Sequence, residues 1–382
     1  MTRKFRNDAL DALIVGAGFA GLSTAYHLSK KGVKRLVVIE HDPKLGGHAS
    51  GRNAGMIRQA IADPVLAKLA CQGRRCLAQC EKKGWTGTRL VPNGSLLLAK
   101  DKEINELKKT ASILKNEGLT AQWFSHEEAV TRVPLLEGGD FKKSLFCSSD
   151  AMIDIDALIH GFYNALKKRR VPVLLGHTLK SIKQEGRYFR VAAGDKTFLT
   201  RRIVNAAGAW AGAVAHEAEA APILLRAYRR HLLLAKPFDP FSASWPFVWD
   251  LTRNFYFRPQ GRSLLLSACD TRRMKNITLT VQKETNDPKA ESALRKKLNG
   301  FSNQFRLVSI KSIKSGLRTI SPDSRFVIGE DSRLKGFFWV AGLGGHGMTT
   351  SFAVGDFASD LILGRKREPA LVKALSPGRF VR

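Results

Sequence analysis

The sequence predicts an α/β and α+β fold, in which a parallel sheet with covering helices is discontinuous in sequence and receives an inserted antiparallel sheet. Three observations lead to this prediction. Residues 11–40 read as strand, glycine-rich turn, helix and strand, and residues 337–363 read as a second strand, turn and helix. Between them, residues 229–268 are rich in strand patterns with buried apolar runs. The two ends of the chain are therefore expected to build one domain, and its middle much of another.

The first unit carries a motif for binding phosphates. An apolar strand runs into Gly16-x-Gly18-x-x-Gly21, and a helical segment follows. The first glycine permits the tight turn, the second lets a pyrophosphate approach the backbone, and the third lets helix and strand pack closely. Phe19 and Ala20 lie in the same turn, where the helix N-terminus offers free N–H groups. The unit is therefore expected to bind a dinucleotide.

The segment after the second strand indicates which dinucleotide. The strand 35–39 ends on Glu40, where a carboxylate can bind ribose hydroxyls. Residues 46–55 are nearly all small, which suggests backbone passing closely along a long ligand such as FAD; a flexible surface loop is the alternative. Arg52 either stays solvated or helps to neutralise the pyrophosphate. The predicted FAD contacts of this segment are His41, Gly47, His48, Ala49, Ser50, Arg52, Asn53, Ala54 and Gly55.

Three short motifs accompany the N-terminal unit in a fixed order along the chain: residues 49–55, 204–210 and 342–347. Together they resemble the FAD-dependent D-amino-acid oxidase family, which includes glycine oxidase, sarcosine oxidase and D-amino-acid dehydrogenases. Within that family the chain is most similar to the bacterial D-arginine dehydrogenase type, also through residues 152–158, 255–259 and 315–318. The resemblance implies FAD as cofactor. It adds the contacts Ala207, Gly208, Trp210, Gly344, Gly345, His346, Gly347, Met348 and Thr349.

Periodicity and breaker residues divide the rest of the chain. We expect residues 1–84, 145–215 and 320–382 to form the Rossmann-like FAD-binding domain, and residues 85–144 and 216–319 to form the inserted antiparallel-sheet substrate domain. Helices are expected at 64–83, 101–117, 156–168 and 348–363, and strands at 95–99, 171–175, 188–192, 197–199, 203–205 and 337–341. The turn before residue 348 would direct a helix N-terminus at the edge of the flavin that becomes negative on reduction.

Four side chains are candidates for substrate chemistry. Arg318 is expected to bind a substrate carboxylate in two-point contact, and the resemblance matches it to the family's carboxylate-binding arginine. Arg229 opens a buried strand and is a weaker second candidate; its neighbour Arg230 is the alternative. Tyr256 either faces the pocket or is a core tyrosine with its hydroxyl at the rim. His346 either faces the substrate or caps the turn.

These residues and the resemblance together predict oxidation of a small amino acid, of the D-enantiomer, by hydride transfer from Cα to flavin N5. The imine would hydrolyse to a 2-oxo acid. Glycine or an N-methyl amino acid, and then a 2-hydroxy acid, are the alternative substrates. The strand 93–98 carries no acid that could pair with a cationic substrate side chain. The cofactor loop, which is the segment from Glu40 to residue 60, offers the apolar Met56 and Ile57. A neutral or apolar amino acid is therefore expected as substrate. Oxygen or a quinone is the expected electron acceptor.

The net charge of +30 raises the question of a polyanionic partner. The 63 lysine and arginine residues are dispersed in short clusters and gather in no single arm or helix. We expect a cytoplasmic enzyme with a basic surface. Peripheral contact with an anionic membrane at its inner face is the second alternative, and an RNA-binding or RNA-acting flavoprotein is the third, with nucleic acid disfavoured. The cysteines lack the spacing of zinc ligands, so no metal site is expected.

Overall fold

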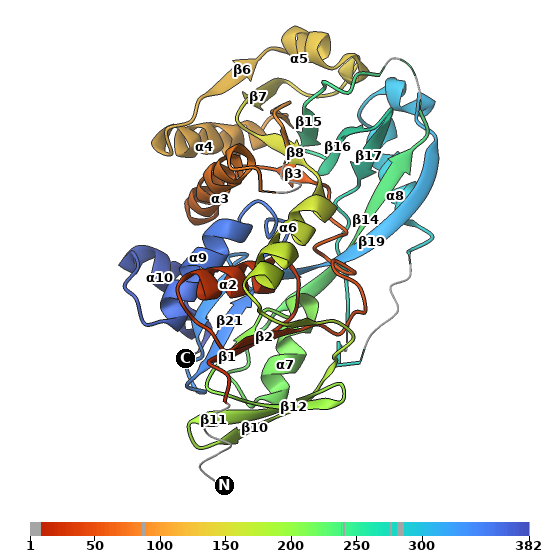
Figure 1. Cartoon of the computed structure of the whole chain (residues 1–382). Helices are drawn as coiled ribbons and strands as arrows, with labels where there is room; N and C mark the ends of the chain where they lie inside the picture. The colour runs from red at the N-terminus through yellow and green to blue at the C-terminus, as the bar shows by residue number, and fades with distance from the viewer. Residues whose placement is uncertain are drawn as a thin grey trace.

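The computed structural model describes residues 9–85, 89–237, 239, 241–275, 277–280 and 286–381. Two large sheets lie in the lower and upper halves of the molecule as seen in Figure 1. The long strands β14 (Arg226–Ala235) and β19 (Ile310–Ile320) pair along nearly their whole length and run from one half to the other. The two halves are therefore linked by paired strands.

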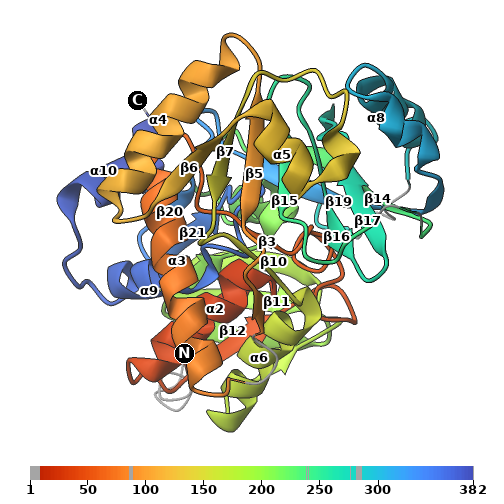
Figure 2. The ribbon, with the colours of Figure 1, turned by 90° about the horizontal axis from the view of Figure 1, so that it is seen from above.

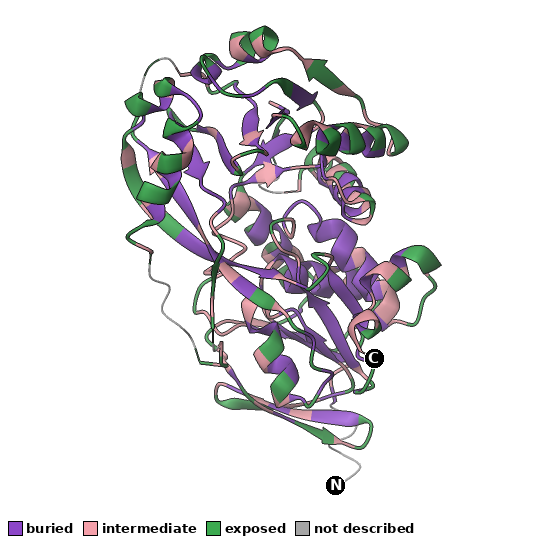
Figure 3. Ribbon diagram, turned by 180° about the vertical axis from the view of Figure 1, so that it is seen from behind, coloured by how far each residue is buried: buried purple, intermediate pink, exposed green. Residues whose placement is uncertain are grey.

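The lower sheet contains the strands that flank the glycine motifs. Its order is β20, β21, β13, β1, β2 and β9, and all neighbours are parallel except β20 and β21. The bounds are β1 (Ala12–Val15), β2 (Leu36–Ile39), β9 (Val173–Leu174), β13 (Ile203–Asn205), β20 (Val327–Glu330) and β21 (Phe337–Ala341). Every residue of β1 and β2 is buried, as expected for parallel strands covered on both faces, and Figure 3 shows these strands in purple.

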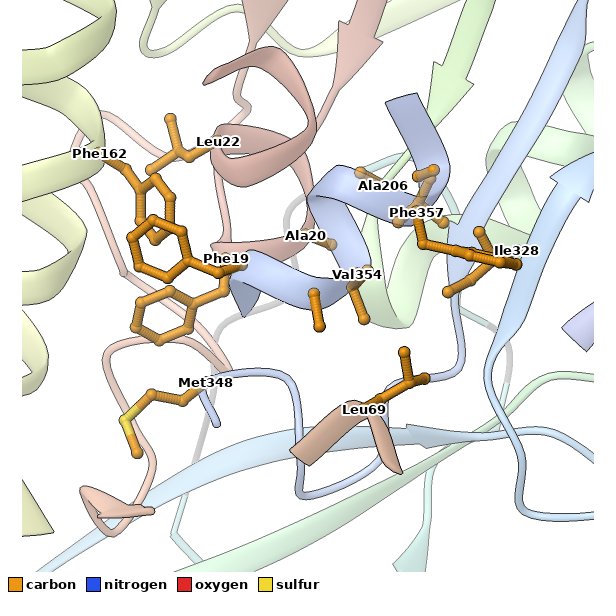
Figure 4. Close-up of a cluster of buried hydrophobic side chains, with 14 of the residues drawn as sticks. Phe19, Ala20, Leu22, Leu69, Phe162, Ala206, Ile328, Met348, Val354 and Phe357 are labelled. Carbon is orange, nitrogen blue, oxygen red and sulfur yellow. The ribbon is translucent and has the colours of Figure 1, made fainter. Parts of the chain in front are cut away.

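Two helices from opposite ends of the chain pack together on this sheet. They are α2 (Phe19–Lys30) and α9 (Ser351–Ile362). The hydroxyl of Ser23 in α2 donates a hydrogen bond of 2.7 Å to the carbonyl oxygen of Ser351. A Cβ atom built at Gly355 would lie 2.6 Å from the carbonyl carbon of Ser23, so only glycine permits this approach. Figure 4 shows the apolar cluster around the two helices, which includes Phe19, Phe162 and Met348.

The upper sheet has nine strands and is mostly antiparallel. Its order is β18, β14, β17, β16, β15, β5, β7 and β6, with β19 paired to the second edge of β14. The bounds are β5 (Ser95–Ala99), β6 (Ala121–Phe124), β7 (Lys143–Cys147), β15 (Phe247–Asp250), β16 (Phe255–Gln260), β17 (Ser263–Ser267) and β18 (Arg272–Arg273). One face, with Phe257 and Leu266, packs into a large apolar core. The other face, with Tyr256 and Leu265, packs against Ala54 of the cofactor loop.

Smaller elements complete both halves, and Figure 2 shows them from above. A three-stranded sheet consists of β3 (Met56–Ile57), β8 (Ala151–Ile153) and β4 (Leu90–Val91), and another of β10 (Leu179–Glu185), β11 (Tyr188–Ala193) and β12 (Lys196–Thr200). The remaining α-helices are α3 (Pro64–Lys82), α4 (Glu103–Asn116), α5 (His126–Arg132), α6 (Ile155–Lys168), α7 (Ala211–Glu217), α8 (Ala290–Asn299) and α10 (Pro369–Leu375). Asp63 caps α3 by accepting a hydrogen bond from the N–H of Leu66.

Two expected elements are shorter than their patterns suggested. The helix expected at 348–363 begins only at Ser351, because Thr350 still belongs to the preceding turn and donates its N–H to His346. The strand expected at 171–175 is reduced to β9, because only Val173 and Leu174 pair with β2. The upper-sheet strand β7 spans the expected domain boundary between residues 144 and 145. Among the described residues, no helix is long and apolar enough to cross a membrane.

Candidate active site and cofactor cleft

The turn after β1 is built around glycines that no larger residue can replace without strain. Gly16 has a φ of +106°, and a Cβ atom there would lie 2.5 Å from the carbonyl oxygen of Ala206, which follows β13. A Cβ atom at Gly18 would lie 2.8 Å from the hydroxyl oxygen of Ser50, which accepts a hydrogen bond of 3.0 Å from the N–H of Phe19. The glycines thus bring the cofactor loop and the end of β13 against the start of α2.

Glu40, at the end of β2, is oriented by main-chain donors. One carboxylate oxygen accepts a hydrogen bond of 2.7 Å from the N–H of Ala17, and the other accepts one of 3.0 Å from the N–H of Asp42. The side chain therefore lies beside the glycine turn with lone pairs still available, as binding of ribose hydroxyls requires.

Three rings stand together at the cleft. The indole of Trp210 lies 4.6 Å from both His41 and His48, measured between ring centroids, and the Nε2 atoms of the two histidines are 2.8 Å apart. Burial lowers the pKa of both imidazoles, so both are neutral at physiological pH. The Nε1 of Trp210 is buried and has no hydrogen-bond partner among the described residues. A ligand with acceptor atoms would satisfy it.

The cleft along the carboxyl edge of the parallel sheet encloses about 1270 Å³ of space not filled by atoms, and part of this space is open solvent. Most predicted cofactor contacts line it: Gly16, Gly18, Phe19, Ala20, Glu40, His41, Gly47, His48, Ala49, Ser50, Asn53, Ala207, Gly208, Trp210, Gly344, Gly345, Gly347 and Met348. Six do not: Gly21, Arg52, Ala54, Gly55, His346 and Thr349. Arg52, for example, donates a hydrogen bond of 3.1 Å to the carbonyl oxygen of Ser315. A Cβ atom at Gly345 would meet no atom within 4 Å, which leaves room for a ligand.

Some lining and supporting residues were missed from the sequence. Residues 177–179, from the loop after β9 to the first residue of β10, line the cleft, yet His177 and Thr178 belong to no motif that indicates a ligand. Arg258 lies under the cofactor loop and donates hydrogen bonds to the carbonyl oxygens of Ala54 and Pro259. Burial lowers the pKa of Arg258 to about 10. Alternation along the strand Phe255–Gln260 shows that the side chain of Arg258 leaves the sheet on the same face as Tyr256. It does not show which loop covers that face.

Arg318 lines this cleft and is only 5% exposed. Its guanidinium donates hydrogen bonds of 2.6 Å to the carbonyl oxygen of Arg52 and 3.3 Å to that of Leu317. These contacts orient the group without neutralising it, and an arginine has five N–H donors in all. Burial lowers the pKa of Arg318 to about 10, with the nearby Arg230 acting in the same direction. Arg318 is therefore a desolvated cation with N–H donors left for a further acceptor.

Tyr256 is buried on the sheet face that turns toward Arg318. Its ring lies 4.9 Å from that of Trp249, and it stands opposite Ser267 in the β16–β17 register. Burial raises the pKa of the Tyr256 phenol, and the charges of Arg230 and Arg318 lower it again in part. The structure thus brings Tyr256 into the same electrostatic environment as Arg318.

The two adjacent arginines of β14 point to opposite faces of the sheet. Arg229 stands opposite Leu317, on the sheet face that does not carry Tyr256. Burial and the charge of Arg272 lower the pKa of Arg229. Arg230 stands opposite Gly316 and acts on Tyr256. The structure therefore does not bring Arg229 together with the other predicted site residues, whereas it does bring Arg230, the alternative.

His346 lies in the turn before α9 and is half-buried. Burial, together with the positive charges of Arg58 and Arg230, lowers the pKa of His346 to about 3. The imidazole is therefore neutral at physiological pH, and it is too weak a base to take a proton from an ammonium group. Its backbone caps the turn as well, since its carbonyl oxygen accepts the N–H of Thr350 at 3.0 Å.

The paired glycine turns, the carboxylate of Glu40 beside the first of them and the long cleft at the carboxyl edge of a parallel sheet define a dinucleotide-binding protein. The family model described as FAD dependent oxidoreductase (DAO) matches residues 11–361. The chain belongs to this family of FAD-dependent oxidoreductases. The residues of the cleft fit FAD, with Glu40 placed for the ribose and the N-terminus of α2 for the pyrophosphate.

The known proteins that resemble the chain are named for activity on different amino acids. Human mitochondrial sarcosine dehydrogenase is 25% identical over 93% of this chain and 40% of its own length. L-proline dehydrogenase from P. horikoshii has a TM-score of 0.85 and 21% identity, with 97% of this chain and 98% of that one covered. Glycine oxidase from Geobacillus kaustophilus has a TM-score of 0.81 and 19% identity, with 97% and 99% covered.

These comparisons establish the family but not a subgroup. The chain spans about two fifths of the length of the first curated relatives that it matches. Sarcosine, L-proline and glycine differ in chirality and in substitution at nitrogen. The finer likeness to D-amino-acid dehydrogenases stays a prediction.

Proposed function

We propose that the chain oxidises a carbon–nitrogen bond of an amino acid with FAD as the electron acceptor. The substrate is a D-amino acid in this proposal, and glycine or an N-methyl amino acid is the alternative that the named relatives favour. The observation that carries the proposal is Arg318, a buried guanidinium that lines the cleft and has donors left for a carboxylate. Tyr256 lies beside it and can donate to the same carboxylate.

Binding by Arg318 would set the carbon that reacts. A two-point contact between guanidinium and carboxylate fixes both the position and the plane of the bound group. The amine and Cα are then held in the part of the cleft lined by Gly344 and Gly345. FAD, when bound there, supplies a two-electron acceptor.

The surroundings favour a neutral substrate amine. The same field of Arg58 and Arg230 that lowers the pKa of His346 would lower the pKa of a substrate ammonium in that position. In the reaction the C–H bond at Cα breaks and its electron pair leaves as hydride, while the nitrogen lone pair forms the C=N bond. Water then adds to the imine and releases a 2-oxo acid and the amine. No side-chain base is needed in this scheme, because the proton is lost on binding.

Oxygen and a quinone remain the proposed acceptors for the reduced enzyme. A quinone would bring the basic surface against anionic lipid, at roughly 1 kcal/mol for each basic residue near the membrane. Reoxidation rates with oxygen and with a soluble quinone analogue distinguish the two acceptors. A cytoplasmic location, with at most peripheral membrane contact, is part of the same proposal.

The proposal is tested by anaerobic reduction of the flavin with both enantiomers of each amino acid, glycine, N-methyl amino acids and 2-hydroxy acids. We expect bleaching by an amino acid or N-methyl amino acid. Arg318→Ala should lower the efficiency of reduction by about 100-fold or more, because a buried charge contact is lost. The exposed Arg262→Ala is the matched control. An unchanged efficiency in Arg318→Ala, with FAD content preserved, would remove the carboxylate-binding assignment.

A further inference from the structure

Three arginine side chains from separate segments act electrostatically in one region beside the cleft, which Arg318 itself lines. Arg318 lies on β19 and Arg230 on β14, and Arg58 follows directly after β3. Because Arg230 stands opposite Gly316 in the antiparallel register, its side chain leaves the sheet on the same face as that of Arg318, two residues further along β19. Tyr256 lies on this face as well.

Arg58 reaches the same region from the cofactor side. Its N–H donates a hydrogen bond of 3.3 Å to the hydroxyl of Thr349, in the turn before α9. Its guanidinium lies 4.3 Å above the centre of the Trp249 ring, on the face of the upper sheet that carries the tyrosine. Arg58 and Arg230 both act electrostatically on His346. Arg58 therefore bridges the gap between the turn and the sheet.

The positive charges of these groups are not balanced by ion pairs. Among the described residues, Arg58, Arg230 and Arg318 form no salt bridge with a carboxylate. The Nε atoms of Arg58 and Arg230 are buried and have no hydrogen-bond partner in that part of the chain. The contacts of Arg318 are to backbone carbonyl oxygens alone.

Asp150 and Glu106 act electrostatically on Arg58, and Asp270 acts on Arg318, but none of these acids forms an ion pair with the three arginines. Asp150 is fully buried and accepts a hydrogen bond of 2.7 Å from the hydroxyl of Ser95. Asp270 accepts one of 2.6 Å from the imidazole of His231. Glu106 lies on the exposed face of α4. Three guanidinium groups thus lie in this region without an ion-paired acid among the described residues.

A desolvated charge without a partner is costly, and like charges that share a pocket raise the cost further. One substrate carboxylate on Arg318 offsets one of three guanidinium charges. Arg58, whose guanidinium rests on the Trp249 ring, and Arg230 would still lack an anionic partner. A ligand with a second anionic group would therefore stabilise the site more than a neutral amino acid can. The second carboxylate of such a ligand would pair with the arginines, in the role that an Asp or Glu side chain of the protein would otherwise have.

We propose that the substrate carries a second carboxylate, which Arg58 and Arg230 bind while Arg318 holds the first. This inference rests on the proposed amino-acid oxidation and names its substrate class. The second carboxylate belongs either to the side chain, as in aspartate and glutamate, or to a substituent on the amine, as in N-carboxymethylglycine. The sequence led to the expectation of a neutral side chain, because the strand 93–98 carries no acid and Met56 and Ile57 are apolar. It did not show that Arg58, the next residue, lies beside Trp249 in the folded protein.

The first test compares substrates that differ only in the second charge. Flavin reduction is measured anaerobically with aspartate and asparagine and with glutamate and glutamine, in both enantiomers, and with N-carboxymethylglycine and sarcosine. We expect at least one dianionic substrate to react roughly 30-fold more efficiently than its neutral partner, as for a buried charge contact. Neutral partners that react equally well or better in all pairs would overturn the inference.

The second test uses variants at the proposed contact. Arg58→Gln should abolish most of the preference for the dianionic member of the best pair, because it removes a contact to the second carboxylate. The efficiency with the neutral member should fall less, since that substrate loses only the field of Arg58 on its amine. Arg58→Lys should retain part of the preference because the charge remains. The exposed Arg262→Gln serves as the matched control. Equal losses with both members of the pair would show that Arg58 acts only through the structure.

Binding without turnover gives an independent readout. Titration of the oxidised enzyme with succinate, followed by the flavin absorbance, should show tighter binding than titration with succinamate, its neutral isostere at one end. Arg58→Gln should remove the difference. Equal affinity for both ligands in the unmodified protein would contradict the inference.

The outcomes separate this inference from the function on which it rests. If neutral amino acids reduce the flavin and dianionic ones do not, the amino-acid oxidation stands and the second carboxylate site is wrong. If no amino acid of any charge reduces it, both fail.

Discussion

Gly21 makes the closest approach between α2 and the strand that precedes it, so Gly21→Ala should be severely destabilising. A Cβ atom there would lie 3.0 Å from the carbonyl carbon of Gly16 and 3.2 Å from the Cγ2 of Ile14, with the carbonyl oxygen of Gly16 nearer still. Backbone atoms cannot rotate away, so the helix must shift by a substantial fraction of an ångström. Overpacking of this kind costs about 3 kcal/mol. The shift would also move the N–H groups that are placed for the pyrophosphate.

The chain offers a matched control for this substitution. Gly212 also lies in a helix, α7, but it is exposed and a Cβ atom there would meet nothing within 4 Å. Gly212→Ala should therefore gain up to about 1 kcal/mol from helix propensity. Urea unfolding of the two apoproteins, followed by circular dichroism, and FAD affinity, followed by flavin fluorescence, measure both effects. Equal stability and equal FAD affinity of the two variants would refute the packing argument.

Three further predictions concern pH, a buried acid and the surface charge. Because the pKa of His346 is lowered to about 3, the unfolded chain binds a proton below pH 6.5 that the folded chain does not. Stability should thus fall as the pH drops from about 6.5 to about 3, and unfolding curves of His346→Gln should fall less over that range. Asp331 is buried and accepts hydrogen bonds from the indole N–H of Trp339 and from backbone N–H groups, so Asp331→Asn should lose about 3 kcal/mol in urea unfolding, unlike the exposed Asp195→Asn. Any binding to anionic vesicles or RNA through the +30 charge should vanish with added salt, as cosedimentation and filter binding can show; salt-resistant RNA binding would contradict this.

Local patterns were sufficient for the parallel-sheet unit and for the cofactor. A positive φ at Gly16 and a close backbone approach at Gly21 are requirements of one turn, and only glycine meets them. The residues that satisfy such a requirement lie within a few positions of each other, so they leave a readable motif. The family model over residues 11–361 agrees with the family that these motifs predicted.

The arginine residues near the proposed substrate position were harder to predict from the sequence. Alternation shows that Arg229 and Arg230 point to opposite faces of a strand, but it does not show which face turns toward the cofactor. That choice depends on the register between β14 and β19, whose paired residues are far apart in the chain. In a chain with 63 basic residues, a single arginine carries little information by itself.

The sequence by itself determined the fold class and the dinucleotide motif, because each is expressed in neighbouring residues, and the resemblance to a known family supplied the candidate Arg318. Only the tertiary structure showed that Arg58, Arg230 and Arg318 act in one electrostatic region, that Arg229 does not join them, and that residues 177–179 line the cleft. The physical reason is that burial and electrostatic coupling depend on distance in space. Strand register and sheet packing set these distances between segments that share no local pattern.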